Sequence, residues 1–385
     1  MKNIAILGST GSIGCNTLEV VDHLWPQFRV VALAAGCNAS LLATQVEKYK
    51  PKIVSLRRRG EAEKFKRKFK DLKLRIAYGP EGAEEVAGFE ENDIVVSAIT
   101  GIDGLRPTLT AVRAGKKVAL ANKESMVVAG AILQKEASRT RAQIIPVDSE
   151  HSGVFQCLAK EKKKNVKKVI LTASGGPFFW VPLKEMKKKT LEDALKHPRW
   201  KMGKKVTVDS ATMMNKGLEL LEAHWLFGLN PDQLDVLIHP QSIVHSLVEL
   251  KDGSVLAQLS PTDMRIPIQY ALTSPEREGS LLPPLNLSRS QVLEFYEVDE
   301  KKFPLFALAR LALTEGESYP VVLNAANEVV VAAFLERRLK FSEIAGLVTK
   351  AVEHHQKRKV RTLEEIFALD QETRTHTWNL LKQRY

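Results

Sequence analysis

The sequence predicts an α/β protein that begins with a doubly wound parallel sheet, continues with a central α+β region and ends in a helical region. Apolar strand-like runs alternate with helical patterns over the first 150 residues, which favours a parallel sheet. Farther along, two strand-like runs flank the turn Lys251-Asp252-Gly253-Ser254, which is typical of a hairpin. From residue 304 onward helical periodicity dominates, in residues 322–338, 341–356 and 362–369.

The alternating N-terminal part should form six strands of the parallel sheet. We expect them at residues 3–7, 29–34, 53–56, 93–98, 117–120 and 143–147. Ligands of such sheets gather at the carboxyl ends of the strands. Residues that directly follow these runs are therefore the first candidates for function.

A glycine-rich turn follows the first of these strands. Gly8, Gly11 and Gly14 are spaced as GxxGxxG, and a helix is expected to open near Cys15. Glycines at such a turn let backbone amides approach a pyrophosphate at the helix N-terminus, which predicts a dinucleotide site.

The end of the second strand favours NADP over NAD. Residues 34–38 read Ala-Ala-Gly-Cys-Asn and lack the acidic residue that binds the ribose of NAD. Asn38 and the arginine run at residues 57–59 are alternative partners for a 2′-phosphate, and the arginines read equally well as solvated side chains.

Polar clusters follow the two last strands of this part. Lys123 lies in Ala-Asn-Lys-Glu-Ser, and Asp148 and Glu150 lie in Asp-Ser-Glu-His. If strand geometry continues to its end, the two acids at i and i+2 project together. Paired carboxylates are good ligands for a hard metal ion, although a salt-bridged turn or a helix N-cap is an alternative.

The stretch from 206 to 227 is predicted to combine a short strand, an acid–serine pair and an amphipathic helix that ends at Gly228. Ser210 suits the N-cap of that helix. Asn215, Lys216 and Glu219 are three or four residues apart, so they should share one helix surface. A solvated face would also carry such residues.

Two loops of the central region have candidate binding roles. Ser174 lies in a loop of small residues after a strand at 168–172, where backbone amides can meet an anion. Trp200 and Met202 lie in a polar segment that begins at His197 and ends at Gly203, which suggests a lid, or side chains packed against the domain.

Composition restricts the class of protein. No apolar run approaches the roughly 20 residues of a membrane span, and the N-terminus begins almost at once with a strand. Three widely spaced cysteines suggest reduced thiols in the cytoplasm. The net charge of +12 suits anionic small substrates, and nucleic-acid binding is disfavoured because aromatic residues do not interleave with the basic runs.

Six motifs occur in the order GSTGSIG, ANKES, PVDSEHS, LTASGGPF, HPRWKMG and VDSATMMNKGLE. Together they resemble the 1-deoxy-D-xylulose-5-phosphate reductoisomerase family over essentially the whole chain. The resemblance implies a Rossmann-like NADPH-binding domain (1–148), a catalytic metal- and substrate-binding domain with a lid loop (149–280), a linker (281–303) and a helical domain (304–385).

The same resemblance implies the reaction. The family converts 1-deoxy-D-xylulose 5-phosphate to 2-C-methyl-D-erythritol 4-phosphate in non-mevalonate isoprenoid biosynthesis, with NADPH and Mg²⁺ or Mn²⁺, and with Co²⁺ as a further candidate. It also implies a cytoplasmic homodimer that binds neither nucleic acid nor membrane. Two competing readings remain: an NADP dehydrogenase that needs no metal, and a non-catalytic protein that senses NADP or binds nucleic acid.

Site residues carry over by motif. Asp148, Glu150 and Glu219 match metal ligands, and Lys123 matches a lysine near the reacting substrate oxygens. Substrate contacts are implied for Ser149 and His197, with a phosphate pocket made of Ser174, Ser210, Asn215 and Lys216. The lid residues are His197, Trp200 and Met202, and the nucleotide contacts are Thr10, Gly11, Ser12, Ile13, Gly36, Asn38, Asn122, Glu124 and Gly203.

Three further positions complete the resemblance. His151 and His245 match family histidines whose role the resemblance does not define. Cys37 stands where the family often has a polar or basic residue, which leaves the partner of the 2′-phosphate open.

Overall fold

The chain forms two compact units. The computed structural model describes residues 1–289 and 292–383. The first unit comprises Met1–Ser125, Ala131–Ser152 and Asp263–Pro284, and the second comprises Met126–Gly130, Gly153–Thr262 and the described part of Leu285–Tyr385.

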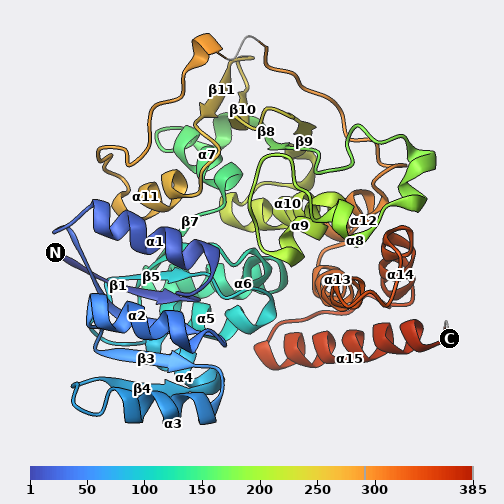
Figure 1. Cartoon of the computed structure of the whole chain (residues 1–385). Coiled ribbons are helices and arrows are strands. Elements are labelled where there is room, and N and C mark those ends of the chain that lie inside the picture. Colours follow the sequence, from blue (N-terminus) through green and yellow to red (C-terminus); the bar gives the residue numbers. More distant parts are fainter. Residues whose placement is uncertain (290–291, 384–385) are drawn as a thin grey trace. The chain divides into compact units, whose positions relative to one another are not determined.

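The first unit contains a parallel seven-stranded sheet in the order β4-β3-β2-β1-β5-β6-β7 (Figure 1). Its strands are β1 (Lys2–Leu7), β2 (Phe28–Ala35), β3 (Ile53–Leu56), β4 (Arg75–Tyr78), β5 (Ile94–Ser97), β6 (Lys117–Leu120) and β7 (Gln143–Pro146). The order reverses direction between β1 and β5, so the predicted doubly wound sheet is confirmed, with a switch point beside the glycine turn.

The expected set of six strands lacked β4. This strand has only four residues and follows a strongly basic segment, so its short apolar pair, Ile76 and Ala77, gave no clear alternation. Its backbone pairs with β3, and this pairing with a strand elsewhere in the chain makes the segment a strand.

The helices of the first unit connect these strands or pack beside them. They are α1 (Ser12–His23), α2 (Ala39–Tyr49), α3 (Arg59–Lys68), α4 (Gly79–Ala87), α5 (Leu105–Arg113) and α11 (Arg265–Thr273). Two more, α6 (Lys123–Thr140) and α7 (Ser149–Cys157), begin in this unit and pass partly into the second. Residue Ala129 interrupts the helical geometry of α6.

The second unit contains a four-stranded sheet in the order β11-β10-β8-β9. Its strands are β8 (Val166–Ala173), β9 (Leu234–Ile238), β10 (Val244–Leu250) and β11 (Val255–Leu259). The predicted hairpin is confirmed as β10 and β11. The expectation of a purely antiparallel sheet is wrong, because β9 follows a long helical connection and pairs parallel to β8.

The second unit also contains α-helices. They are α8 (Leu191–Ala194), α9 (Lys204–Ala211), α10 (Met214–Phe227), α12 (Pro304–Glu315), α13 (Tyr319–Leu335), α14 (Phe341–Glu353) and α15 (Leu363–Lys382). The helical character predicted from residue 304 onward is confirmed. In this group α13 packs against α9, α14 and α15.

The strand expected at the start of residues 206–227 is wrong, because these residues form helix α9. Alternating Val206, Thr207 and Val208 gave a strand-like pattern, but Thr207 and Ala211 are both buried, one helical turn apart. Packing against α13 therefore outweighs the β-propensity of the branched side chains.

The helices within the described ranges are too short or too polar to span a membrane.

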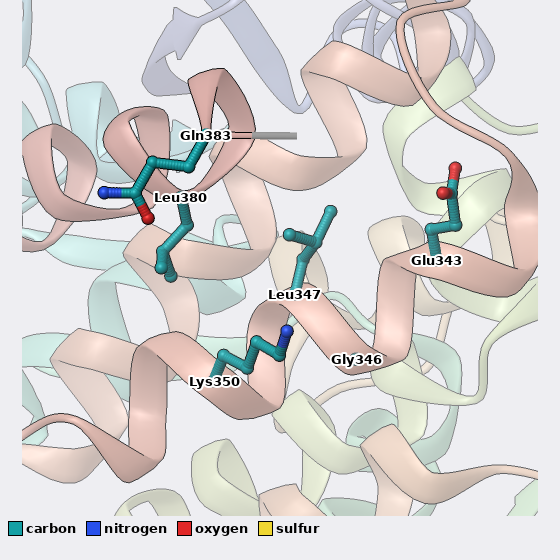
Figure 2. A pocket seen from close by; sticks show the side chains of 6 residues that line it. All are labelled: Glu343, Gly346, Leu347, Lys350, Leu380 and Gln383. Carbon is teal, nitrogen blue, oxygen red and sulfur yellow. The ribbon is translucent and has the colours of Figure 1, made fainter. Parts of the chain in front are cut away.

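One pocket lies away from the predicted site residues. A pocket of about 370 Å³ lies between α14 and α15, lined by Glu343, Gly346, Leu347, Lys350, Leu380 and Gln383 (Figure 2). None of the predicted site residues lines this pocket.

Candidate active site

The turn after β1 has the form that a pyrophosphate requires. Gly8 has a φ of +86°, and a Cβ there would lie 2.6 Å from the carbonyl oxygen of Ala98. A Cβ on Gly14 would overlap the backbone of Gly8 and Ser9, so only glycine fits this turn. The turn places Thr10 before Gly11, and Ser12 and Ile13 open helix α1.

The first turn of α1 is open to an anion. Gly11 is the N-cap residue and has no side chain to accept from the first amides, and this turn carries no acidic residue. The free amides and the positive end of the helix dipole therefore favour a phosphate group.

The end of β2 brings both candidate partners of a 2′-phosphate together. The amide of Arg57 donates to the carbonyl oxygen of Gly36 at 3.3 Å, so the arginine run lies beside the turn. Asn38 caps α2 by accepting from the amide of Leu41 at 3.1 Å. Arg57 pairs with Asp103 at 3.2 Å. The choice between Asn38 and the arginines thus stays open.

Asn122 holds the loop after β5. Its Oδ1 accepts from the amide of Ser125 at 3.0 Å and caps α6, while its Nδ2 donates to the carbonyls of Ile99 at 2.6 Å and Gly101 at 2.9 Å. Nδ2 also lies 3.3 Å from the carboxylate of Glu124. These bonds fix the edge of the sheet where the nucleotide is expected.

A buried ion pair joins the two strand-end clusters of the first unit. Lys123 Nζ lies 2.7 Å from Asp148 Oδ2, and both side chains are at least 86% buried, with exposures of 10% and 14%. The other oxygen, Oδ1, lies 3.3 Å from His151 Nδ1 and accepts from the amide of Glu150 at 3.3 Å. Ser149 donates to Glu150 Oε2 at 2.8 Å.

The strand geometry assumed for Asp148 and Glu150 is wrong. Helix α7 begins at Ser149, and the carbonyl of Asp148 accepts from the amide of Ser152 at 2.8 Å. Both alternatives left open by the sequence therefore occur: Asp148 starts a helix and pairs with a lysine. Two carboxylates, an ammonium and a hydroxyl are still gathered at the carboxyl end of β7.

In the second unit, Ser174 and His197 form a hydrogen-bonded pair at the end of β8. Ser174 Oγ lies 2.9 Å from His197 Nε2 and accepts from the amide of Gly176 at 3.1 Å. His197 Nδ1 accepts from the amide of Trp200 at 2.8 Å, so the ring proton must sit on Nε2 and point at Ser174. The serine hydroxyl keeps its own proton for a further acceptor.

Burial lowers the pKa of His197 to about 4. The imidazole is therefore neutral at physiological pH. The hydrogen bonds that Nδ1 accepts from the amides of Arg199 and Trp200 also require an unprotonated Nδ1.

The predicted lid residues are half-buried. Trp200 faces the ring of His245 with centroids 6.3 Å apart, and Met202 is also half-buried. His245 is buried, and its Nε2 lies 3.3 Å from the carbonyl of Ser260. Gly203 is the N-cap residue of α9. The packed reading of this segment describes the structure, and its role as a lid stays a prediction.

The shared helix surface predicted on α10 is confirmed. Asn215 Nδ2 donates to Glu219 Oε1 at 2.5 Å, and Lys216 Nζ donates to the other oxygen, Oε2. Lys216 and Glu219 are 5% and 1% exposed, so the solvated-face alternative is wrong. Buried charges need such pairing to offset their desolvation.

The N-cap predicted at Ser210 is wrong. Ser210 lies within α9, and α10 begins four residues later at Met214. Met213 precedes it in the left-handed region, with a φ of +60°, so a sharp corner separates the two helices. Ser210 is still near Ser174, because a Cβ on Gly176 would lie 2.5 Å from the Ser210 carbonyl oxygen.

The sequence pattern does not single out Asp209, the acid beside Ser210. The structure shows that Asp209 is 1% exposed and pairs with Lys205 at 2.9 Å. The signal in the sequence is an acid four residues after a lysine, a spacing that places the two side chains on one helix surface.

Comparison with known proteins identifies the family. Sequence profiles described as 1-deoxy-D-xylulose 5-phosphate reductoisomerase, its C-terminal domain and DXP reductoisomerase C-terminal domain match residues 4–130, 144–227 and 259–376. The chain is 49% identical over 370 residues to the 1-deoxy-D-xylulose 5-phosphate reductoisomerase of Chlorobium chlorochromatii (strain CaD3), with 96% of this chain and 97% of that protein covered. It is 51% identical over 376 residues to that of Pelotomaculum thermopropionicum (strain DSM 13744 / JCM 10971 / SI), with 96% of each covered.

Solved structures agree with these relatives. A crystal structure of DOX-P reductoisomerase in complex with NADPH, fosmidomycin and magnesium superimposes with a TM-score of 0.93 at 39% identity, covering 99% of this chain and 98% of that one. The Zymomonas mobilis enzyme in complex with NADPH gives a TM-score of 0.92 at 38% identity, with 99% of both chains covered. The chain belongs to the 1-deoxy-D-xylulose 5-phosphate reductoisomerase family.

Proposed function

We propose specific roles for the residues described above in the reaction of this family. The protein is an NADPH- and metal-dependent oxidoreductase that converts 1-deoxy-D-xylulose 5-phosphate to 2-C-methyl-D-erythritol 4-phosphate, a step of isoprenoid biosynthesis. One observation carries the assignment of roles. Lys123 and Asp148 form an ion pair at the carboxyl edge of the seven-stranded sheet, the same sheet whose first strand leads into the glycine turn.

NADPH fits the turn between β1 and α1. The glycines leave room for the pyrophosphate, and the uncapped amides of α1 supply donors for it. We assign these contacts to Thr10, Gly11, Ser12 and Ile13, with further contacts from the segments that carry Gly36, Asn38, Asn122, Glu124 and Gly203.

A divalent metal ion fits the carboxylates. We assign Asp148, Glu150 and Glu219 as its ligands. Three carboxylates are hard oxygen donors, which suit Mg²⁺ or Mn²⁺, and we keep Co²⁺ as a further candidate. Lys123 forms an ion pair with Asp148, and Lys216 forms one with Glu219.

The substrate phosphate is assigned to Ser174, Ser210, Asn215 and Lys216. The hydroxyl proton of Ser174 and the ammonium of Lys216 are donors, and charge-assisted hydrogen bonds hold phosphates well. Binding energy from this remote group orients the carbon skeleton at the reacting end.

The remaining residues act on the reacting end of the substrate. Bound metal supplies Lewis-acid polarisation of the substrate oxygens, and NADPH supplies hydride. The Lys123 ammonium stabilises negative charge that develops on those oxygens, and the Ser149 hydroxyl orients the carboxylate of Glu150. The segment of His197, Trp200 and Met202 excludes water.

An assay of NADPH oxidation tests this assignment. The purified protein should oxidise NADPH only when 1-deoxy-D-xylulose 5-phosphate and Mg²⁺ or Mn²⁺ are both present. Oxidation that does not need metal and survives Asp148→Asn would favour a simple NADP dehydrogenase. Salt-dependent binding of DNA or RNA without turnover would favour the non-catalytic reading.

We further propose that the protein is a cytoplasmic homodimer. Among the described strands, β11 lies at an edge of the four-stranded sheet, and an unpaired strand edge favours pairing with a second copy. Cys15, Cys37 and Cys157 are free thiols, which suits a reducing compartment. Light scattering should give twice the mass of one chain, and a monomeric mass that persists at high concentration would contradict the dimer.

A further inference from the structure

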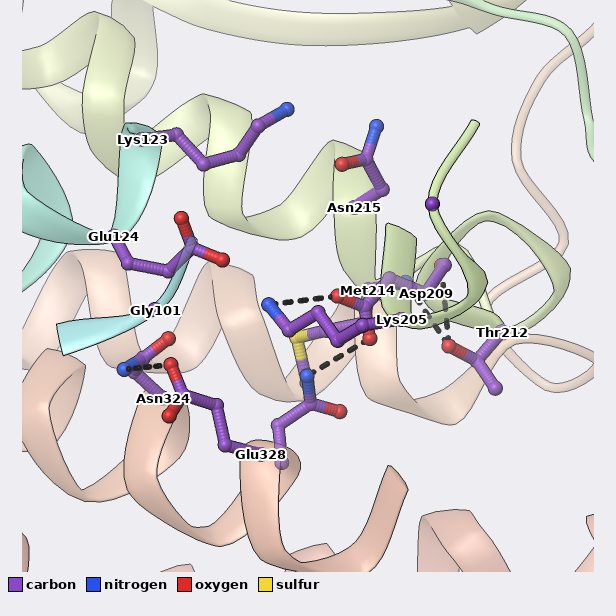
Figure 3. A network of polar contacts seen from close by, with 12 residues as sticks. Gly101, Lys123, Glu124, Lys205, Asp209, Thr212, Met214, Asn215, Asn324 and Glu328 are labelled. Carbon is purple, nitrogen blue, oxygen red and sulfur yellow. Dashed lines mark hydrogen bonds and ion pairs between the residues drawn. The ribbon is translucent and has the colours of Figure 1, made fainter. Parts of the chain in front are cut away.

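The buried carboxylate of Asp209 has two donors, one for each oxygen. Lys205 Nζ, one turn earlier on α9, lies 2.9 Å from Oδ2 (Figure 3). Asn327 Nδ2, from α13, donates to Oδ1 at 2.9 Å. Because both oxygens are engaged and the residue is 1% exposed, the side chain has one orientation.

The corner between α9 and α10 depends on the same residue. The carbonyl oxygen of Asp209 accepts from Thr212 Oγ1 at 3.2 Å, and Thr212 Oγ1 accepts from the amide of Met214 at 3.4 Å (Figure 3). Met213, with its φ of +60°, lies within this short chain of bonds. The start of α10, which precedes Asn215 and Lys216 directly, is thereby tied to Asp209.

The loop that carries Ser174 rests on the same corner. Gly176 has a φ of +64°, and a Cβ there would lie 2.5 Å from the carbonyl oxygen of Ser210 and 3.3 Å from the Cα of Ala211. A shift of the C-terminal end of α9 would therefore displace Ser174 as well as Ser210.

On the other side, polar contacts hold α13 in place. Asn327 is fully buried. Asn324 donates to Glu328 Oε1 at 3.2 Å within α13 itself, so this bond does not tie α13 to another helix (Figure 3). Arg374 of α15 pairs with Glu328 at 2.5 Å and with Asp370 at 2.6 Å. Asn327 therefore presents its amide from a helix that is itself held by a half-buried ion pair to α15.

We propose that Asp209 and Asn327 are positioning residues for the phosphate pocket. Their hydrogen bond lets the C-terminal helices hold the α9–α10 corner so that Ser210, Asn215 and Lys216 face the substrate phosphate. This inference rests on the proposed function, which assigns those three residues to the phosphate.

Asn327→Leu and Asn324→Leu form a matched pair for the test. Both asparagines are fully buried on α13, but only Asn327 reaches Asp209. Asn327→Leu should raise the KM for the sugar phosphate and the inhibition constant of inorganic phosphate by up to roughly tenfold, because the lost bond is to Asp209 and only part of its free energy reaches the phosphate. The kcat and the dissociation constant of NADPH should change less than twofold or so. Asn324→Leu should leave the phosphate constants near wild type.

An exchange of the two side chains keeps the test decisive if Asn327→Leu does not fold. Asn327→Asp alone places two carboxylates against each other and should weaken phosphate binding. Adding Asp209→Asn restores one donor and one acceptor, so it should recover much of the loss.

Three results would overturn the inference: unchanged phosphate constants in a folded Asn327→Leu, an equal effect of Asn324→Leu, or no recovery in the exchanged pair. Lys216→Met separates this inference from the proposed function. If Lys216→Met leaves the inhibition constant of phosphate unchanged, the pocket itself is misassigned. If Lys216→Met raises that constant but Asn327→Leu leaves it unchanged, the pocket stands and the positioning role fails.

Discussion

Replacing Lys216 by Met tests the phosphate pocket, because this residue is 5% exposed and, besides its ion pair with Glu219, it is assigned to the substrate phosphate. Met keeps the aliphatic length and removes the ammonium. A hydrogen bond to a charged group contributes roughly 1.5–3 kcal/mol, which corresponds to about a 10- to 150-fold loss of affinity. Glu219 keeps its bond from Asn215, at 2.5 Å, so the carboxylate is not left alone.

The assay measures initial rates of NADPH oxidation against the sugar phosphate concentration, at saturating NADPH and Mg²⁺. We expect the KM to rise by the amount above, and the inhibition constant of inorganic phosphate to rise with it. The kcat should fall by a smaller factor. Lys188→Met, which removes an exposed ammonium in the same unit, is the matched control and should resemble wild type.

A KM within about twofold of wild type, in folded Lys216→Met, would refute the reasoning, since a phosphate ligand that contributes 1.5 kcal/mol cannot be lost silently. Equal changes in Lys188→Met would also refute it, because they would reflect the net charge of the unit and not one contact.

Three other predictions follow from the same geometry. Glu219→Gln should reduce metal-dependent turnover to background, and it should leave the dissociation constant of NADPH unchanged; residual Mg²⁺-stimulated turnover would argue against its role. Gly14→Ala should raise the dissociation constant of NADPH at least about tenfold in a fluorescence titration, because the new Cβ overlaps the backbone of the turn; Gly60→Ala, where the added Cβ meets open space, should bind NADPH normally. His197 should titrate near pH 4 by NMR in the ligand-free protein. When the predicted lid opens, His197 should bind a proton below about pH 6.5. Acidification from pH 6.5 toward pH 4 should therefore favour opening of this segment. A titration of His197 near pH 6.5 in the closed segment would contradict this prediction.

The parts of the fold that local patterns encode were predictable. A strand, a glycine turn and a helix follow one another at the N-terminus, so the nucleotide turn could be located from 14 consecutive residues. The spacing of Asn215, Lys216 and Glu219 likewise fixed their common surface, because a helix has a constant period.

The errors come from contacts between residues far apart in the sequence. Val206 and Val208 favour a strand in isolation, and only the packing of α9 on α13 makes them helical. Asp209 and Asn327 are 118 positions apart, so no local pattern could have joined them. β9 became parallel to β8 through a long crossover, which periodicity alone does not reveal.

The domain limits at residues 148, 280 and 303 stay predictions about function. The structure groups residues by packing, and it assigns Asp263–Pro284 to the first unit, where α11 packs against α1. Arg265 of α11 pairs with Glu19 of α1 at 3.0 Å, which ties this late segment to the nucleotide-binding part.

Mn²⁺ binding, followed by electron paramagnetic resonance, tests the central claim most directly. The claim is that Asp148, Glu150 and Glu219 share one ion during turnover. With NADPH and a substrate analogue present, the wild-type protein should bind one Mn²⁺ per chain, and Asp148→Asn, Glu150→Gln and Glu219→Gln should each weaken binding strongly. Mn²⁺ bound by Glu219→Gln with wild-type affinity would contradict the account.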